Sequence, residues 1–300
     1  IASVIVGQEQ TVDLVLTAIL ANGHVLIEGV PGVAKTLLAR LTARLIDADF
    51  SRVQFTPDLM PSDVLGTTVF NMKTNAFDFH QGPIFADIVL VDEINRAPAK
   101  TQAALFEVME ERQISIDGTT HRMGDLYTIL ATQNPVEQEG TYKLPEAQLD
   151  RFLMKITMDY PSLEEEVNIL ERHHTNAALV KLDDIVPAIT KEELLSLRAF
   201  MNQVFVDRTL LQYIALIVQQ TRTSKAVYLG ASPRASVAML QSSKAYALLQ
   251  GRDFVTPEDI KFVAPYVLQH RLILTAEAEM EGYSPVKVTQ RLIDKVEVPK

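Results

Sequence analysis

The chain has 300 residues, which is too long for one typical compact domain and suits two. It contains no cysteine, which excludes disulfide bonds and thiolate metal sites and fits the reducing cytoplasm, the location we expect. The formal net charge is −10 without any basic tract, so no nucleic-acid partner is expected, because such binding depends on clustered Lys and Arg. No apolar run approaches the roughly 18 residues that span a bilayer, so no membrane insertion is expected.

Up to about Pro161, short apolar runs alternate with amphipathic segments. One helical face is marked by apolar residues between Val12 and Leu20, and a second helix is predicted to begin at Lys35. Continuous apolar runs suit strands that are covered on both faces, as in a parallel sheet between helices. Residues 1–161 are therefore predicted to form an α/β domain, with strands at Val25–Glu28, Arg52–Phe55, Ile88–Val91, Tyr127–Ala131 and Phe152–Met158.

Two hairpins are predicted to interrupt this domain. The first joins Thr67–Phe70 to Phe77–Phe79 through a polar turn. The second joins Ile114–Ile116 to Thr119–His121 through Asp117-Gly118, a dipeptide that favours a tight type I′ turn.

After Pro161 the strand signals fade and helix starts multiply. Ser232 and Thr256 each precede a proline, so each is predicted to cap a helix with its hydroxyl. Residues 162–300 are therefore predicted to form a second, smaller and all-helical domain. Its further signals are capping-box pairs at Ser162/Glu165 and Thr190/Glu193 and long helical runs at Leu210–Gln220 and Ala235–Leu249.

The most informative segment is the glycine-bearing turn after the first predicted strand. Residues 29–36 match the phosphate-loop pattern G-x-x-x-x-G-K-[ST], except that Ala34 occupies the last glycine position. Lys35 would reach the β- and γ-phosphates of ATP, and the Thr36 hydroxyl would bind Mg²⁺. The alternative is an ordinary strand-to-helix turn with a chance Lys-Thr, and Ala34 matters only if its position needs a positive φ. The residues assigned to nucleotide binding here are Gly29, Val30, Pro31, Gly32, Val33, Ala34, Lys35, Thr36 and Leu37.

An apolar strand at Ile88–Val91 ends in two carboxylates, Asp92 and Glu93. Buried carboxylates are costly unless they are paired or bound to a metal. Beside a phosphate loop, Asp92 would hold Mg²⁺ through water, and Glu93 would orient and polarise the attacking water. In isolation a solvated strand exit would be the better interpretation; the phosphate loop upstream favours the catalytic one.

Three further polar residues are candidates. Asn134 follows another apolar strand and could sense the γ-phosphate as a neutral donor, although a turn residue before proline explains it almost equally well. Arg151 precedes the last predicted strand, and Arg234 lies in the first turn of a helix, where a cation is unfavourable unless an anion shares the site. Each arginine alone is more often a surface salt-bridge residue.

Together these motifs resemble the AAA+ superfamily, and they resemble its MoxR family most closely. MoxR members often read GVPGxAKT, so Ala34 favours this family more than it weakens the expectation of ATP binding. The motifs extend from near the first residues to the helical half, at Val6–Gln8, Gly29–Thr36, Val91–Ala97, Ala131–Pro135, Leu144–Phe152 and Gly230–Ala235.

The resemblance implies a role for each matching residue. Gly7 and Gln8 look like the segment beside adenine, and Asn134 looks like sensor 1. Arg151 looks like the arginine finger, which would act on ATP bound by the neighbouring subunit. Arg234 looks like sensor 2, which would bring the lid onto the γ-phosphate of its own subunit.

The resemblance also implies the fold and assembly. We expect a P-loop NTPase of the AAA+ type, with a parallel five-stranded sheet sandwiched by helices, followed by an all-α lid. The family forms hexameric rings and often works with von Willebrand factor A-type partners. The two hairpins match insertions of the clade that also holds the magnesium chelatase ATPase subunit, where such loops face the pore or a partner.

The function expected from the sequence is Mg²⁺-dependent ATP hydrolysis in a homo-oligomeric ring that remodels or matures client proteins. Three alternatives stay open. One is a nucleotide-gated binding scaffold that barely hydrolyses ATP, and another is a DNA motor, which the acidic composition disfavours. The third is a magnesium chelatase ATPase subunit, which shares the same clade.

Overall fold

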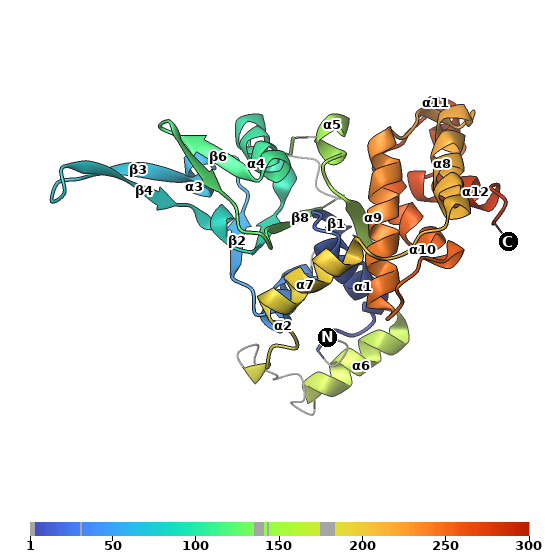
Figure 1. Cartoon of the computed structure of the whole chain (residues 1–300), viewed down its shortest axis with the longest axis horizontal. Helices are drawn as coiled ribbons and strands as arrows, with labels where there is room; N and C mark the ends of the chain where they lie inside the picture. The colour runs from blue at the N-terminus through green and yellow to red at the C-terminus, as the bar shows by residue number, and fades with distance from the viewer. Residues whose placement is uncertain (1–3, 31, 135–140, 143, 175–183, 300) are drawn as a thin grey trace. The chain divides into compact units, whose positions relative to one another are not determined.

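The computed structural model describes residues 4–30, 32–134, 141–142, 144–174 and 184–299. Its central sheet has five strands in the order β2-β5-β8-β1-β9. Figure 1 labels β2, β8 and β1 of this sheet. The pairs β1–β8, β2–β5 and β5–β8 are parallel. All five predicted strands are confirmed with small shifts at their ends, as β1 Val25–Gly29, β2 Phe50–Gln54, β5 Ile88–Asp92, β8 Thr128–Gln133 and β9 Met154–Met158.

The innermost strands are buried because helices cover the sheet. Every residue of β5 is buried, and its four apolar side chains are fully inaccessible to solvent. Helix α2 packs against β2 and β5. This burial explains the uninterrupted apolar sequence of β5, since a strand with one solvated face would alternate apolar and polar residues. The helices of this half are α1 Glu9–Leu20, α2 Lys35–Leu45, α3 Pro61–Leu65 and α4 Ala99–Glu111, with short 3₁₀ turns at Pro83–Phe85 and Ile94–Arg96.

Both predicted hairpins are confirmed. The first pairs β3 (Gly66–Asn71) with β4 (Ala76–Gln81), and the second pairs β6 (Gln113–Ile116) with β7 (Thr119–Arg122). Asp117 and Gly118 have φ values of 50° and 77°, the two left-handed conformations that a type I′ turn requires.

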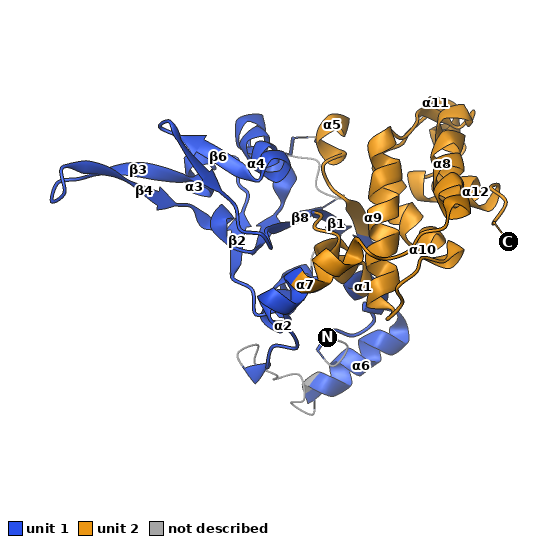
Figure 2. Cartoon of the chain, in the orientation of Figure 1, with its two compact units in different colours: residues 1–12, 24–144, 157–195 blue, residues 13–23, 145–156, 196–300 orange. Residues whose placement is uncertain are grey.

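The chain divides into two compact units, each assembled from three stretches of sequence (Figure 2). The first unit collects residues 1–12, 24–144 and 157–195, and the second collects residues 13–23, 145–156 and 196–300. The single domain boundary between residues 161 and 162 stays a prediction of the sequence.

The last part of the chain is helical, as predicted, apart from one short antiparallel pair, β10 (Val227–Leu229) with β11 (Ile273–Leu274). A small core of Leu274, Ala278, Val288 and Leu292 holds this pair against the last helices. Helix α5 Glu146–Leu149 precedes β9, and the helices that follow β9 are α6 Leu163–His174, α7 Lys191–Met201, α8 Arg208–Thr223, α9 Pro233–Leu249, α10 Pro257–Leu268, α11 Ala276–Met280 and α12 Pro285–Asp294. Within the ranges described, no helix combines the length and apolar character needed to cross a membrane.

Both predicted capping boxes are confirmed. The Ser162 N–H donates to Glu165 Oε2 at 2.7 Å, and the Glu165 N–H donates back to Ser162 Oγ at 3.4 Å. In the second box, the Thr190 N–H donates to Glu193 Oε2 at 2.8 Å, and the Glu193 N–H donates to Thr190 Oγ1 at 3.2 Å. These reciprocal bonds satisfy backbone donors that the first turn of a helix would otherwise leave open.

The two proline-preceded caps differ. At Thr256, the Asp259 carboxylate accepts from both the backbone N–H and the hydroxyl, at 2.7 and 3.1 Å. At Ser232, the prediction of a capping hydroxyl is wrong. The residue lies at the N-cap, but its hydroxyl makes no capping hydrogen bond. The Ala235 N–H, from which the hydroxyl was expected to accept, donates instead to the Ser232 backbone carbonyl at 3.0 Å. Ser232 Oγ is buried and has no partner among the described residues.

Candidate functional site

The glycine-bearing loop closes tightly between β1 and α2. Lys35, the first residue of α2, donates through Nζ to the Gly29 carbonyl at 2.6 Å. A Cβ atom on Gly29 would lie 2.7 Å from the Met158 carbonyl oxygen, so only glycine fits where β1 ends. Gly32 has a φ of 89°, and no described atom lies within 4 Å of where its Cβ would be, so the loop is open on that side. Pro31 lies outside the described residues.

Ala34 adopts the left-handed conformation, with φ 61° and ψ 24°. This position therefore requires a positive φ, which is the condition under which alanine in place of the usual glycine matters. An L-residue in this conformation costs about 1 kcal/mol or more relative to glycine, because its Cβ crowds the backbone. Of the other assigned positions, Val33 is buried and Val30 is half-buried ahead of α2, and Thr36 and Leu37 are half-buried in its first turn.

Asp92 is held from two neighbouring strands at the end of β5. Its side chain accepts from Arg52 Nε at 2.6 Å through Oδ2 and from Thr132 Oγ1 at 3.0 Å through Oδ1. The residue is only 7% exposed, so the cation and the hydroxyl offset the cost of burying the charge. Thr132 Oγ1 also accepts from the Glu93 backbone N–H at 3.0 Å and so links the two acidic residues.

Glu93 follows directly, in a left-handed conformation with φ 56°. Such a conformation is uncommon for a residue other than glycine and is concentrated at functional sites, where the surrounding structure maintains the strain. Glu93 Oε2 accepts from Gln54 Nε2 at 2.7 Å and lies 3.0 Å from Arg96 Nε. The carboxylate is therefore oriented by one neutral donor and one cation.

These side chains converge because the carboxyl ends of parallel strands meet at one edge of a sheet. Four of the residues singled out from the sequence line one cavity of about 120 Å³ at the ends of β2, β5 and β8. Three further described residues line the cavity that were not predicted from the sequence, namely Arg52, Gln54 and Thr132. Gln54 and Thr132 lie at or near the carboxyl ends of predicted strands, the same signal that marked the acidic pair, whereas Arg52 opens its predicted strand and carries no such signal. The described residues that line the cavity are Lys35, Arg52, Gln54, Asp92, Glu93, Thr132 and Asn134.

The segment matched to adenine binding belongs to the same unit as the loop. Gly7 has a φ of 72°, and a Cβ atom there would lie 2.2 Å from Glu165 Oε1, so this segment runs beside the start of α6. Gln8 Oε1 accepts from Thr11 Oγ1 at 2.8 Å.

The two predicted arginines belong to the second unit, whereas the cavity residues belong to the first (Figure 2). Arg151 follows α5, is half-buried, and donates through Nη1 to the Ala147 carbonyl at 3.4 Å. Arg234 is exposed in the first turn of α9.

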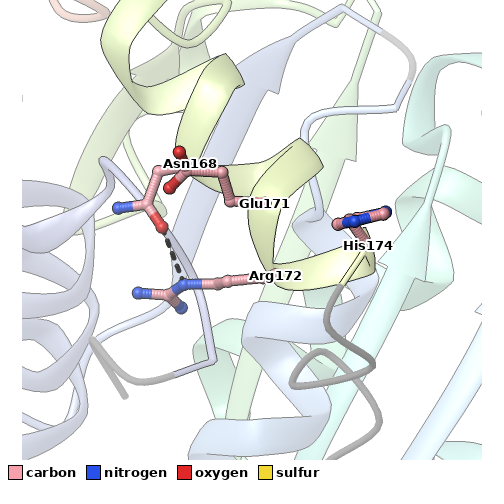
Figure 3. A pocket seen from close by; sticks show the side chains of 4 residues that line it. All are labelled: Asn168, Glu171, Arg172 and His174. Carbon is pink, nitrogen blue, oxygen red and sulfur yellow. Dashed lines mark hydrogen bonds between the residues drawn. The ribbon is translucent and has the colours of Figure 1, made fainter.

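A second pocket lies along α6 and contains none of the predicted site residues. Figure 3 shows its lining side chains, all from this one helix, with Arg172 Nε donating to Asn168 Oδ1 at 3.0 Å. The other lining residues are Glu171 and His174. Across the part of the chain that the structure describes, no group of three or more acidic or histidine side chains could hold a metal by itself.

The order of the strands completes the assignment of a class. The strand with the phosphate loop, β1, and the strand with the acidic pair, β5, are separated by β8, which ends in Thr132 and Gln133 and leads to Asn134. This inserted strand, together with a helical region after the sheet, defines a P-loop NTPase of the AAA+ type.

Comparison with known proteins agrees with this class and narrows it. Residues 24–154 match the family described as "ATPase family associated with various cellular activities (AAA)", and residues 219–294 match the AAA lid domain. The chain is 44% identical over 306 residues to the chaperone MoxR1 of Mycobacterium tuberculosis, covering 99% of this chain and 80% of that protein. It is 48% identical over 296 residues to the uncharacterized protein YeaC of Bacillus subtilis, covering 99% and 92% of the two chains.

The structural comparison leads to the same family. A crystal structure from Cytophaga hutchinsonii, of a protein provisionally described as an ATPase, superposes with a TM-score of 0.91. The two are 41% identical in sequence, and the alignment covers 100% of this chain and 92% of that one. The chain belongs to the MoxR family of AAA+ ATPases.

Proposed function

We propose that this protein binds and hydrolyses ATP with Mg²⁺ in a hexameric ring of identical chains and uses the turnover to remodel or mature partner proteins. The observation that carries the proposal is the convergence of Lys35, Asp92, Glu93 and Asn134 on one cavity beside the phosphate loop. A cation, a metal-binding carboxylate, a base and a neutral donor are the groups that phosphoryl transfer to water requires.

The residues present fit a magnesium ion. Mg²⁺ prefers hard oxygen ligands and usually keeps several waters, so one hydroxyl and one carboxylate beside a triphosphate suffice. Thr36 would bind the ion directly, and Asp92, already held in place by Thr132 at 3.0 Å, would hold it through water. When bound, Mg²⁺ neutralises phosphate charge.

Each remaining side chain has a proposed role. Lys35 Nζ donates to the Gly29 carbonyl at 2.6 Å, so its ammonium lies within the loop that would wrap the phosphates. Glu93 would orient the attacking water and accept its proton, and Asn134 would donate to the γ-phosphate or to that water. Gly7 and Gln8 would lie beside the base.

The arginines would make activity depend on assembly. Arg151 would complete the site of the neighbouring copy, and Arg234 would bring the lid to the γ-phosphate in its own chain. An arginine that neutralises charge on the transferred phosphoryl can accelerate the reaction by about 10³–10⁵. Loss of the γ-phosphate would release both arginines, and the resulting movement of the lid and the neighbouring subunit would be passed to a client protein. The proposed partners are von Willebrand factor A-type proteins and their substrates.

Replacing Glu93 with Gln tests the assignment. The amide keeps the size of the side chain but removes its basicity, so we expect ATP affinity close to that of the wild type and almost no phosphate release. Both quantities are measured on the same preparation, by nucleotide titration and by a phosphate assay. Glu107→Gln, an exposed position on α4, is the matched control and should keep full turnover. Full turnover by the Glu93 variant would contradict the proposed role.

One observation favours a second candidate, a nucleotide-gated scaffold with little hydrolysis. Glu93 Oε2 is already engaged by Gln54 and Arg96, at 2.7 and 3.0 Å, so these donors compete with an attacking water for the same carboxylate oxygen. Steady-state phosphate release by the wild-type protein decides between the candidates. Binding of ATP with no release above background would support the scaffold.

A further inference from the structure

Three consecutive residues after α10 form hydrogen bonds to residues 150–155, a segment distant in the sequence. Gln269 Nε2 donates to the Lys155 carbonyl at 2.5 Å, and His270 Nε2 lies 3.0 Å from the Phe152 carbonyl. A carbonyl oxygen can only accept, so this histidine nitrogen carries the proton. The third residue, Arg271, makes the most extensive contacts.

Arg271 uses all of its hydrogen-bond donors. Its Nε donates to Asp150 Oδ1 at 2.6 Å, and its Nη2 donates to the carbonyls of Asp150 and Phe152 at 3.1 and 2.8 Å. Its Nη1 donates to the Leu153 carbonyl at 3.1 Å and to the Val267 carbonyl. A guanidinium has five N–H groups, and each is accounted for. The side chain is 4% exposed, so water replaces none of these bonds.

The segment bound in this way contains Arg151. The residues on either side of it, Asp150 and Phe152, are both bonded to Arg271. A guanidinium is planar and rigid, so several bonds from one such group fix the direction of the backbone that accepts them. The backbone of Arg151 is therefore held in one orientation relative to the end of α10.

These bonds explain why residues 145–156 belong to the second unit although most of that unit lies far along the sequence (Figure 2). Arg234 belongs to the same unit. The two arginines assigned to nucleotides are thus carried by one compact body.

We propose that Gln269, His270 and Arg271 form a positioning clamp that holds Arg151 ready for the ATP of the neighbouring copy. The clamp also makes Arg151 move with the lid helices that carry Arg234. The second unit then responds to two nucleotides: the ATP of its own chain through Arg234, and the ATP of the neighbouring chain through Arg151. This inference rests on the proposed function, because it takes Arg151 to act across the subunit boundary.

The same unit offers a matched control. Arg252 donates through both Nη atoms to Asp259 at 2.8 and 2.6 Å, and to the Phe254 carbonyl. Asp259 is 1% exposed, so this ion pair is also buried on one side, but its described bonds lie at the start of α10. Arg252→Lys should loosen the lid without disturbing the segment around Arg151.

The test compares Arg271→Lys with Arg252→Lys in the assembled full chain. Lysine keeps the charge but cannot reproduce the planar fork. We expect Arg271→Lys to lower kcat about 10²-fold, the loss typical of misplacing a catalytic group by about 1 Å, with little change in ATP affinity. Arg252→Lys should keep kcat within about twofold, since the described bonds of Arg252 go to Phe254 and Asp259 and to none of residues 150–155.

Mixed assemblies separate positioning from a general structural role. In a mixture with the Glu93→Gln protein, an Arg271→Lys subunit keeps its own base and receives an intact Arg151 from its neighbour. Turnover per Arg271→Lys subunit should therefore recover at least about tenfold over the unmixed variant, a part of what an arginine finger supplies. Unchanged kcat in Arg271→Lys, or a loss that mixing does not recover, would overturn the clamp.

Arg151→Ala, measured in parallel, distinguishes the two proposals. If Arg151→Ala keeps its turnover, or is not recovered by mixing, the assignment of the arginine finger fails. If it is recovered and Arg271→Lys is not, only the clamp fails. Should Arg271→Lys not fold, His270→Leu and His270→Gln replace it, because only Gln can donate to the Phe152 carbonyl. We then expect His270→Leu to lose ATP turnover and to recover it on mixing with the Glu93→Gln protein, and His270→Gln to keep its turnover. Equal turnover of the two variants would overturn the proposal.

Discussion

Arg52 on β2 donates through Nε to Asp92 Oδ2 on β5 at 2.6 Å, which gives the carboxylate assigned to magnesium a cationic partner on the adjacent strand. An opposite charge at this distance lowers the affinity of a carboxylate for a second cation. The Arg52 side chain is half-exposed, so solvent screens part of the effect.

Removing this arginine should therefore strengthen magnesium binding. We expect Arg52→Gln to lower the Mg²⁺ concentration for half-maximal ATP turnover about two- to fivefold, the range that corresponds to a partly exposed ion pair. A magnesium titration at saturating ATP measures it. Arg40→Gln removes the same charge from an exposed position on α2 and should leave the titration unchanged. An increase in the magnesium requirement would show that Arg52 helps to build the site.

Restoring the missing glycine should stabilise the protein. Because Ala34 has a φ of 61°, Ala34→Gly should raise the free energy of unfolding of the first unit by about 1 kcal/mol. The midpoint of urea unfolding measures the change. The same substitution on the exposed face of α4, Ala103→Gly, should lower stability by about 1 kcal/mol, since that position is helical. A lower midpoint for Ala34→Gly would be inconsistent with the left-handed conformation.

His270 should make the second unit sensitive to acid. Burial lowers the pKa of His270 well below 6.5, and the neighbouring Arg271 and Lys155 act in the same direction. The unfolded chain then binds more protons than the folded chain below pH 6.5. Stability is therefore complete above that pH and falls by up to about 1.4 kcal/mol per pH unit as the pH drops toward the folded pKa.

Thermal unfolding between pH 7.5 and pH 5.5 tests this dependence. We expect His270→Gln to reduce the loss of Tm on acidification, because glutamine does not titrate and can keep the bond to the Phe152 carbonyl. His80→Gln, at an exposed position on β4, should retain the acid sensitivity of the wild type. Identical pH profiles for the wild type and His270→Gln would refute the assignment.

The contact between Gln54 and Glu93 should set the basal rate. Gln54→Ala removes the donor that engages Glu93 Oε2 at 2.7 Å, so this oxygen is less constrained and more accessible to an attacking water. We expect basal phosphate release to rise about two- to tenfold, since one solvent-exposed hydrogen bond is worth about 0.5–1.5 kcal/mol. Gln113→Ala, at the start of β6, serves as the control. A fall in the rate would mean that Gln54 positions the base for catalysis.

Much of the fold and half of the cavity could be predicted from the sequence. The phosphate loop, the strand ending in Asp92 and Glu93, the Asp117-Gly118 turn and the two capping boxes all depend on residues close together in the chain. Local backbone geometry and short-range hydrogen bonds decide such features, so residue type and spacing are sufficient to recognise them.

Local patterns also have a limit that Ser232 illustrates. Serine before proline is a typical helix cap, yet here a backbone carbonyl accepts the hydrogen bond of the Ala235 N–H. Spacing predicted the position of the cap correctly but could not choose between two acceptors on the same residue.

The sequence by itself determined the assignment of the nucleotide-binding residues, since the groups proposed to contact phosphate and metal are grouped in short motifs. Only the tertiary structure decided what surrounds them: Arg52 and Thr132 reach Asp92 from positions 40 residues away on either side, and Arg271 reaches Asp150 across 121 residues. Partners so distant are chosen by the order of strands and the packing of helices. That order depends on burial summed over the whole chain, so no short pattern of residues records it.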